Sequence, residues 1–285
     1  MLQKKKALFL SRQNNNQGNG MKTSVLKQES FFAFDFDCSK RCLKKQYIHT
    51  MNTYFANLKE SVLQLFYPHI CAGCGTDSLP VDSSLCIKCL YDLPVTGFEK
   101  FENNPVEKLF LGRAEINIAT AQLYFAKHYL MQTLMHQFKY KGHKKLGHQL
   151  GMIMGNQLQE SNRFSNIELL IPLPLYVAKE RIRGYNQSEI LCQGISEMMN
   201  IPVVVDAVKR ISATDSQTKK NRLQRWQNME GRFVITNEEK IKNKKLLLVD
   251  DVITTGATLE SCTLALKSVS GVEVNIATLC FSSHF

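Results

Sequence analysis

The residues best suited to chemistry lie in one run, 246–260, which reads LLLVDDVITTGATLE. An apolar stretch ends at two adjacent carboxylates, and a loop of small residues then leads into a helical pattern. The acids are Asp250 and Asp251, and the loop residues are Thr254, Thr255, Gly256, Ala257 and Thr258. Amides at the start of a helix and threonine hydroxyls can surround a phosphate. Carboxylates one turn away can meet ribose hydroxyls or a hydrated Mg²⁺ ion.

The order strand, acidic turn, small loop and helix therefore predicts a site for a sugar phosphate. An ordinary buried strand with an Asp-rich turn is the alternative, but it explains neither the paired acids nor the threonines that follow them. The run resembles the phosphoribosyl pyrophosphate (PRPP) motif of type I phosphoribosyltransferases, which is much more specific than a lone glycine loop.

Four cysteines predict a second, separate site. Cys71 and Cys74 form one Cys-x-x-Cys pair, and Cys86 and Cys89 form another, eleven residues further on. Two such pairs place four sulfurs at the corners of a tetrahedron around a structural zinc ion, with no open position for catalysis. A redox role for one pair is the alternative, and it leaves the other pair unexplained.

Composition indicates a folded protein in a reducing compartment. The chain has 285 residues, 44% of them apolar and 21% charged, and no apolar stretch approaches the roughly 20 residues that cross a membrane. Its nine cysteines are an odd number, which fits one metal site better than a disulfide framework. The five outside the two pairs have no obvious partner: Cys38, Cys42, Cys192, Cys262 and Cys280. We expect a cytoplasmic protein without membrane insertion.

The net charge of +11 is concentrated in the first 50 residues. They hold ten Lys/Arg and three Asp/Glu, a net of +7, which leaves +4 for the other 235. This stretch also contains the polar run QNNNQGNG, and its apolar segment 7–10 is short of the roughly 7–15 residues of a signal peptide. We expect residues 1–50 to be a disordered extension, or to lie upstream of a natural start at Met51.

The remainder divides into a helix with the four-cysteine module at 51–97 and a larger domain at 106–285. Strands and helices alternate in the larger domain, which predicts a parallel α/β sheet whose ligands bind beyond the carboxyl ends of the strands. Expected strands are 116–125, 169–171, 203–205, 233–235, 246–249 and 273–281. Expected helices are 129–138, 146–158, 189–199, 221–227 and one from the motif loop to about 268.

Two basic loops supply further candidates. Arg181 and Arg183 follow the strand 169–171 and could neutralise a diphosphate, although a solvated basic turn is the alternative. The long polar segment 214–231 could be a lid, with Arg225 closing over phosphates, or simply a surface loop.

Five motifs occur in an order that resembles the ComF family, also called the ComF/GntX family, over about residues 58–285. They are the four-cysteine module, Lys139-Tyr140-Lys141-Gly142, Arg183-Gly184-Tyr185-Asn186-Gln187, Gln217-Thr218 with Arg225-x-x-Asn228-x-x-Gly231, and the PRPP motif. The resemblance implies an N-terminal zinc ribbon, a type I phosphoribosyltransferase domain and an association with competence, the uptake of DNA.

By position, the resemblance implies that Asp250 and Asp251 contact the ribose hydroxyls and Mg²⁺. Thr254, Thr255, Gly256 and Thr258 would hold the 5′-phosphate, and the two arginines would meet the diphosphate. The first hypothesis is thus an Mg²⁺-dependent phosphoribosyltransferase with an unidentified acceptor. The alternatives are a non-catalytic PRPP-responsive factor that contacts competence-machinery proteins, and a single-stranded DNA-binding protein. The modest charge of the body argues against the last.

Overall fold

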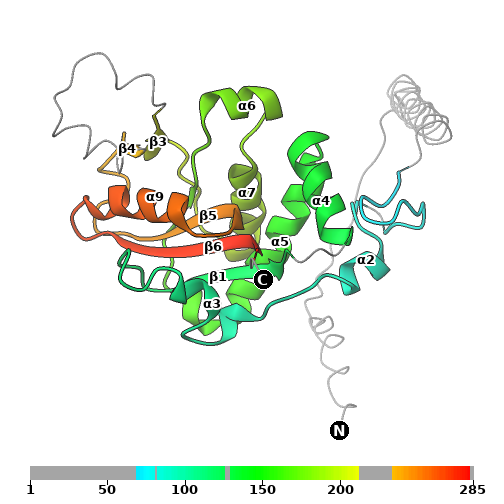
Figure 1. Ribbon diagram of the computed structural model, residues 1–285, viewed down its shortest axis with the longest axis horizontal. Coiled ribbons are helices and arrows are strands. Elements are labelled where there is room, and N and C mark those ends of the chain that lie inside the picture. The colour runs from blue at the N-terminus through cyan, green and yellow to red at the C-terminus, as the bar shows by residue number, and fades with distance from the viewer. Residues whose placement is uncertain (1–68, 81, 126–128, 212–232, 283–285) are drawn as a thin grey trace, which may run out of the picture. The chain divides into compact units, whose positions relative to one another are not determined.

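The computed structural model describes residues 69–80, 82–125, 129–211 and 233–282, which belong to one compact unit, Leu63–Phe285 (Figure 1). The predictions for residues 1–50, for a helix at 221–227 and for Arg225 lie outside these residues. None of the described helices is long and apolar enough to cross a membrane. The boundaries at 97 and 106 stay a prediction.

A four-stranded parallel sheet forms the centre of the fold (Figure 1). Its strands, in spatial order, are β1 (Ala119–Tyr124), β6 (Glu273–Phe281), β5 (Lys245–Ile253) and β2 (Leu169–Pro172). The two central strands are buried along most of their length, as expected where helices cover both faces of a parallel sheet. The predicted parallel α/β fold is confirmed.

Helices of different length surround this sheet. They are α2 (Ile87–Tyr91), α3 (Pro105–Lys108), α4 (Tyr129–Tyr140), α5 (Lys144–Glu160), α6 (Val177–Arg183), α7 (Gln187–Met199) and α9 (Ala257–Lys267), with 3-10 turns η1 (Phe98–Lys100) and η2 (Asn162–Phe164). Successive residues of β5 face opposite cores: Leu247 and Val249 pack with α4, α5 and α7, whereas Leu246 and Leu248 pack with α9. This alternation arises because successive side chains of a β-strand point to opposite faces of the sheet.

Two glycines allow α5 and α7 to pack closely. A Cβ atom at Gly151 would lie 2.4 Å from the carbonyl oxygen of Leu191, and one at Gly194 would lie 2.3 Å from that of His148. No side chain fits at such distances. The contact fixes α7, whose first turn faces the acidic end of β5.

Two predictions of local structure were wrong, and a third was right about the strand but not about the sheet to which it belongs. Val203 makes only an isolated bridge to Leu170, so 203–205 is no strand. The strand Phe233–Ile235 (β4) exists, but it pairs antiparallel with β3 (Val208–Arg210) in a separate two-stranded sheet. The segment with Arg181 and Arg183, expected to be a loop, is helix α6. Its Ala, Lys, Glu and Arg residues favour a helix, which ends at Gly184 with φ 78°.

Candidate functional site

Strand β5 carries the two acids to the carboxyl end of the sheet. Asp250 is half-buried and Asp251 is buried. The Oδ1 atom of Asp250 accepts hydrogen bonds from the Ser188 hydroxyl (3.2 Å) and from the amide of Asp251 (2.8 Å). Burial, and then the neighbouring carboxylate, raise the pKa of Asp250 to about 7 against these stabilising contacts. The acids therefore stand in a strongly interacting, partly desolvated site.

A lysine from another element completes the acidic pair. Lys139, in the last turn of α4, places its Nζ atom 3.0 Å from Oδ2 of Asp251. The motif that contains Lys139 supported the resemblance, but neither this lysine nor Ser188 was assigned to the site. A cation in the last turn of a helix is favourable, and that was the only sequence signal for it.

The predicted phosphate loop lies against the same acids. Asp250 and the five loop residues line one hollow of about 60 Å³, with Val252, Ile253 and Leu259. Gly256 precedes α9 with φ 76°, and no side chain caps the helix, so the first amides have no side-chain partner there. A Cβ at Gly256 would also press within 3.3 Å of the Phe110 ring. The hollow thus has helix-start amides on one side and a carboxylate on the other, although ligand contact by these residues stays a prediction.

Arg113 fixes the phosphate loop from outside. Its Nη1 atom donates to the carbonyl oxygens of Thr255 (2.8 Å) and Leu109 (3.0 Å), and Nη2 forms an ion pair with Glu260 in the first turn of α9. This arginine was not singled out in the sequence, because the contact joins residues 142 positions apart.

The predicted arginines are less closely tied to the acids. Arg183 donates to Oε1 of Gln187 (2.7 Å), and its guanidinium carbon lies 5.8 Å from the ring centre of Tyr140, the neighbour of Lys139. Arg183 is therefore on the side of the site where α4 ends. Arg181 is exposed on α6.

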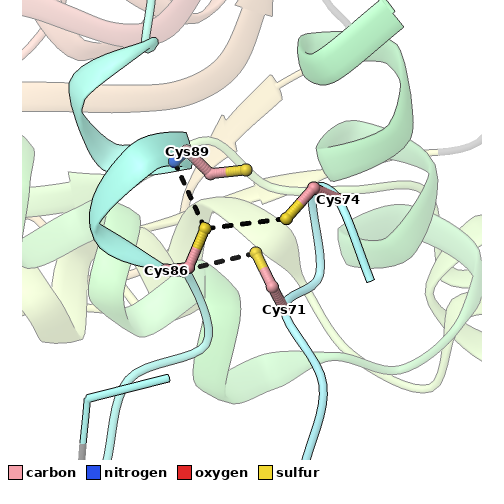
Figure 2. A group of neighbouring side chains, drawn as sticks. All are labelled: Cys71, Cys74, Cys86 and Cys89. Carbon is pink, nitrogen blue, oxygen red and sulfur yellow. Dashed lines mark hydrogen bonds between the residues drawn. The ribbon is translucent and has the colours of Figure 1, made fainter. Parts of the chain in front are cut away.

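The four cysteines form one compact cluster (Figure 2). All four sulfurs lie within 4.8 Å of one another, and the Sγ atoms of Cys74 and Cys86 are 3.6 Å apart. Cys71 accepts N–H bonds from Gly73 (3.4 Å) and Cys86 (3.3 Å), and Cys86 accepts one from Cys89 (3.4 Å). This sulfur spacing with amide donors fits a metal ion held by four thiolates.

The amides also bias the charge of the cluster. Burial opposes a thiolate at Cys71, but N–H groups of Cys74, Cys86 and Gly73 outweigh it and lower the pKa of Cys71 to about 6. Burial, and then the neighbouring thiols, raise the pKa of Cys89. The amide donors therefore favour the thiolate form of Cys71, which is the form of cysteine that binds a metal.

The cysteine cluster is joined to the sheet domain by direct contacts. Gln149 of α5 accepts from the Ser84 amide (2.7 Å) and donates to the Ser83 hydroxyl (2.8 Å). Leu130 of α4 packs so close to Gly73 that a Cβ there would lie 2.6 Å from its Cδ1 atom. The cluster thus supports the start of α4, the helix whose last turn carries Lys139.

Comparison with known proteins agrees with this architecture. Residues 186–284 match a family model described as a phosphoribosyl transferase domain. Competence protein F of Haemophilus influenzae is 29% identical over 155 residues, which cover 52% of this chain and 68% of that protein. Competence protein ComFC of Bacillus subtilis is 25% identical over 135 residues, 46% of this chain and 50% of that protein. The names of these relatives and the matched domain support a ComF family protein. The sheet domain of this chain is a type I phosphoribosyltransferase domain.

Other similarities cover comparable parts of this chain. DNA utilization protein YhgH of Escherichia coli K12 is 26% identical over 153 residues, so the chain spans 66% of that relative's length. Among solved structures, the glutamine PRPP amidotransferase from B. subtilis has a TM-score of 0.35 at 16% identity, over 50% of this chain and 30% of that one. A hypoxanthine phosphoribosyltransferase from Staphylococcus aureus has a TM-score of 0.30 at 19% identity, over 48% and 64%.

Loss of the arginine clamp should loosen the phosphate loop selectively. In Arg113→Ala we expect faster hydrogen exchange of the amides at 254–258, and a loss of only about 1 kcal/mol in unfolding free energy because the ion pair is partly exposed. Lys267→Ala, at the other end of α9, is the control and should leave loop exchange unchanged. Equal exchange in Arg113→Ala and the parent would contradict the clamp.

Proposed function

We propose that this protein binds PRPP with Mg²⁺ at the carboxyl end of β5 and transfers its phosphoribosyl group. One observation carries the proposal: Asp250 and the uncapped amide end of α9 line the same hollow. Helix-start amides favour a phosphate, and a carboxylate in the same hollow can accept hydrogen bonds from hydroxyl groups. A 5-phosphorylated ribose has both groups at its two ends.

Each candidate residue has a separate task in this proposal. Thr254, Thr255, Gly256, Ala257 and Thr258 hold the 5′-phosphate, Asp250 and Asp251 hold the ribose hydroxyls, and Arg181, Arg183 and Arg225 meet the diphosphate. Mg²⁺, held by the ligand together with the two acids, would offset the charge of the leaving diphosphate. Ser188 orients the carboxylate of Asp250, and Lys139 pairs with Asp251 in the absence of the ligand.

The proposed reaction is a displacement at C1 of the ribose. A nucleophile, in our proposal a nitrogen, forms the new bond to C1 as the bond to the diphosphate oxygen breaks, and the diphosphate leaves with that electron pair. Positive charge develops on the sugar, so the chain contributes mainly orientation and electrostatic stabilisation. The loop held by Arg113 and the partly desolvated pair of acids are suited to this task.

A non-catalytic PRPP-responsive factor is the second candidate. The names of the relatives, Competence protein F, ComFC and DNA utilization protein, support a role in DNA uptake or use. In that role, ligand binding would control contact with single-stranded DNA or with competence-machinery proteins. The described cysteines form no disulfide with one another, which supports action in a reducing compartment such as the cytoplasm.

Calorimetric titration of the full-length protein with PRPP in the presence of Mg²⁺ tests the site. We expect binding by the parent and a loss of about 30-fold or more in Asp250→Asn/Asp251→Asn, because charged hydrogen-bonding partners are removed. Asp206→Asn, which alters an exposed ion pair with Lys240, should bind as the parent does. Absence of binding by folded parent protein would refute the proposal.

Release of diphosphate separates the two candidates. If bound PRPP is consumed when nucleobases or amines are added, and if the Asp250→Asn/Asp251→Asn protein does not consume it, the transferase is supported. Binding without turnover across the panel would favour the regulatory candidate.

We propose further that the cysteine cluster holds one zinc ion with a structural role. Cys86→Ser should reduce zinc, measured by elemental mass spectrometry, from about one ion per chain to almost none. It should also lower the free energy of unfolding by several kcal/mol, because binding of a structural metal is coupled to folding. Cys262→Ala, a buried cysteine outside the cluster, should retain zinc. Parent protein without metal, or Cys86→Ser with full zinc content, would contradict the assignment.

A further inference from the structure

The acidic pair already holds a cation that belongs to the chain. Lys139 Nζ lies 3.0 Å from Oδ2 of Asp251, and the two side chains are only 19% and 12% exposed. Water therefore screens this ion pair much less than it screens the surface pairs of the molecule. Lys139 occupies a position on Asp251 that a metal ion or a hydroxyl group of a ligand would otherwise use.

The backbone that carries Lys139 is fixed, whereas its side chain can move. Phe138 is fully buried, and the Tyr185 hydroxyl donates to the carbonyl oxygen of Phe138. On the same helix, Met131 and Leu134 are also fully buried. The four-carbon stem of a lysine allows its ammonium group to change partners without movement of the helix. The backbone of α4 is thus held in place, whereas the ammonium group of Lys139 can change its partner.

One oxygen of the other carboxylate is also engaged. Oδ1 of Asp250 accepts hydrogen bonds from Ser188 and from the amide of Asp251. A divalent cation that binds Oδ2 of Asp251 displaces the ammonium and leaves it close to the new charge, which is unfavourable. A polyanion changes this balance, because it gives the displaced ammonium a new partner. Arg183, in contact with the ring of Tyr140, adds positive charge on the same side.

We propose that Lys139 is a positioning residue: a resident counter-ion of Asp251 that yields only to a ligand with a diphosphate. A divalent cation would then enter the site together with that ligand and not before it. The proposal rests on the proposed function for the identity of the ligand. Its charge argument, however, applies to the metal alone and can be tested without PRPP.

The test compares four full-length proteins: the parent, Lys139→Met, Lys139→Arg and Lys141→Met. Mn²⁺ binding without PRPP is followed by water proton relaxation, and PRPP binding with Mg²⁺ is followed by calorimetry. We expect Lys139→Met to bind Mn²⁺ alone about tenfold more tightly and PRPP about tenfold more weakly than the parent does. Lys139→Arg should retain weak binding of Mn²⁺ alone. Lys141, exposed two residues further on, is the matched control and should match the parent in both titrations.

Opposite signs in the two titrations distinguish a counter-ion from a structural residue. Unchanged or weaker Mn²⁺ binding in Lys139→Met overturns the proposal, because a mere loss of packing would weaken the binding of both Mn²⁺ and PRPP. If Lys139→Met does not fold, Lys139→Gln removes the charge while keeping a hydrogen-bond donor, and the same result is expected. If the parent fails to bind PRPP, the proposed function fails, but the Mn²⁺ titrations still decide the role of Lys139.

Discussion

Two adjacent carboxylates at the end of a buried strand are the constraint on which the rest of the site depends. Charged groups in a partly desolvated position are stable only with hydrogen bonds or counter-ions. Here these come from three elements: Ser188 from α7, Lys139 from α4 and the amide of Asp251 from β5 itself. The site therefore forms only when the sheet and both helices have taken their places.

The helices that serve the acids are themselves positioned by contacts elsewhere. Close packing at Gly151 and Gly194 sets α7 against α5. Gln149 of α5 and Leu130 of α4 contact the cysteine module. A continuous set of contacts thus leads from the cysteines along α4 to Lys139 and Asp251. In this arrangement the cysteine module helps to position α4, the helix that carries Lys139.

Local features were predictable from the sequence, and contacts between distant segments were not. The order of strand, loop and helix around Asp250 follows from neighbouring residues in one short segment, and so does the spacing of the cysteines. Arg113 with Thr255, by contrast, joins residues 142 positions apart, and Ser188 with Asp250 joins residues 62 apart. Helix α6 was missed because its charges suggested a solvated turn, although its residues favour a helix. The pairing of β4 with β3 was missed because a long polar segment separates them.

Phosphorus NMR of PRPP during titration with the full-length protein and Mg²⁺ tests the central claim most directly, because the 5′-phosphate and the diphosphate give separate signals. We expect the 5′-phosphate signal to shift or broaden together with the diphosphate signals, since in the proposed complex the start of α9 and the basic side chains bind opposite ends of one ligand. An unchanged spectrum would contradict this mode of binding. So would a change confined to the diphosphate, which is the result expected from nonspecific attraction to lysines and arginines.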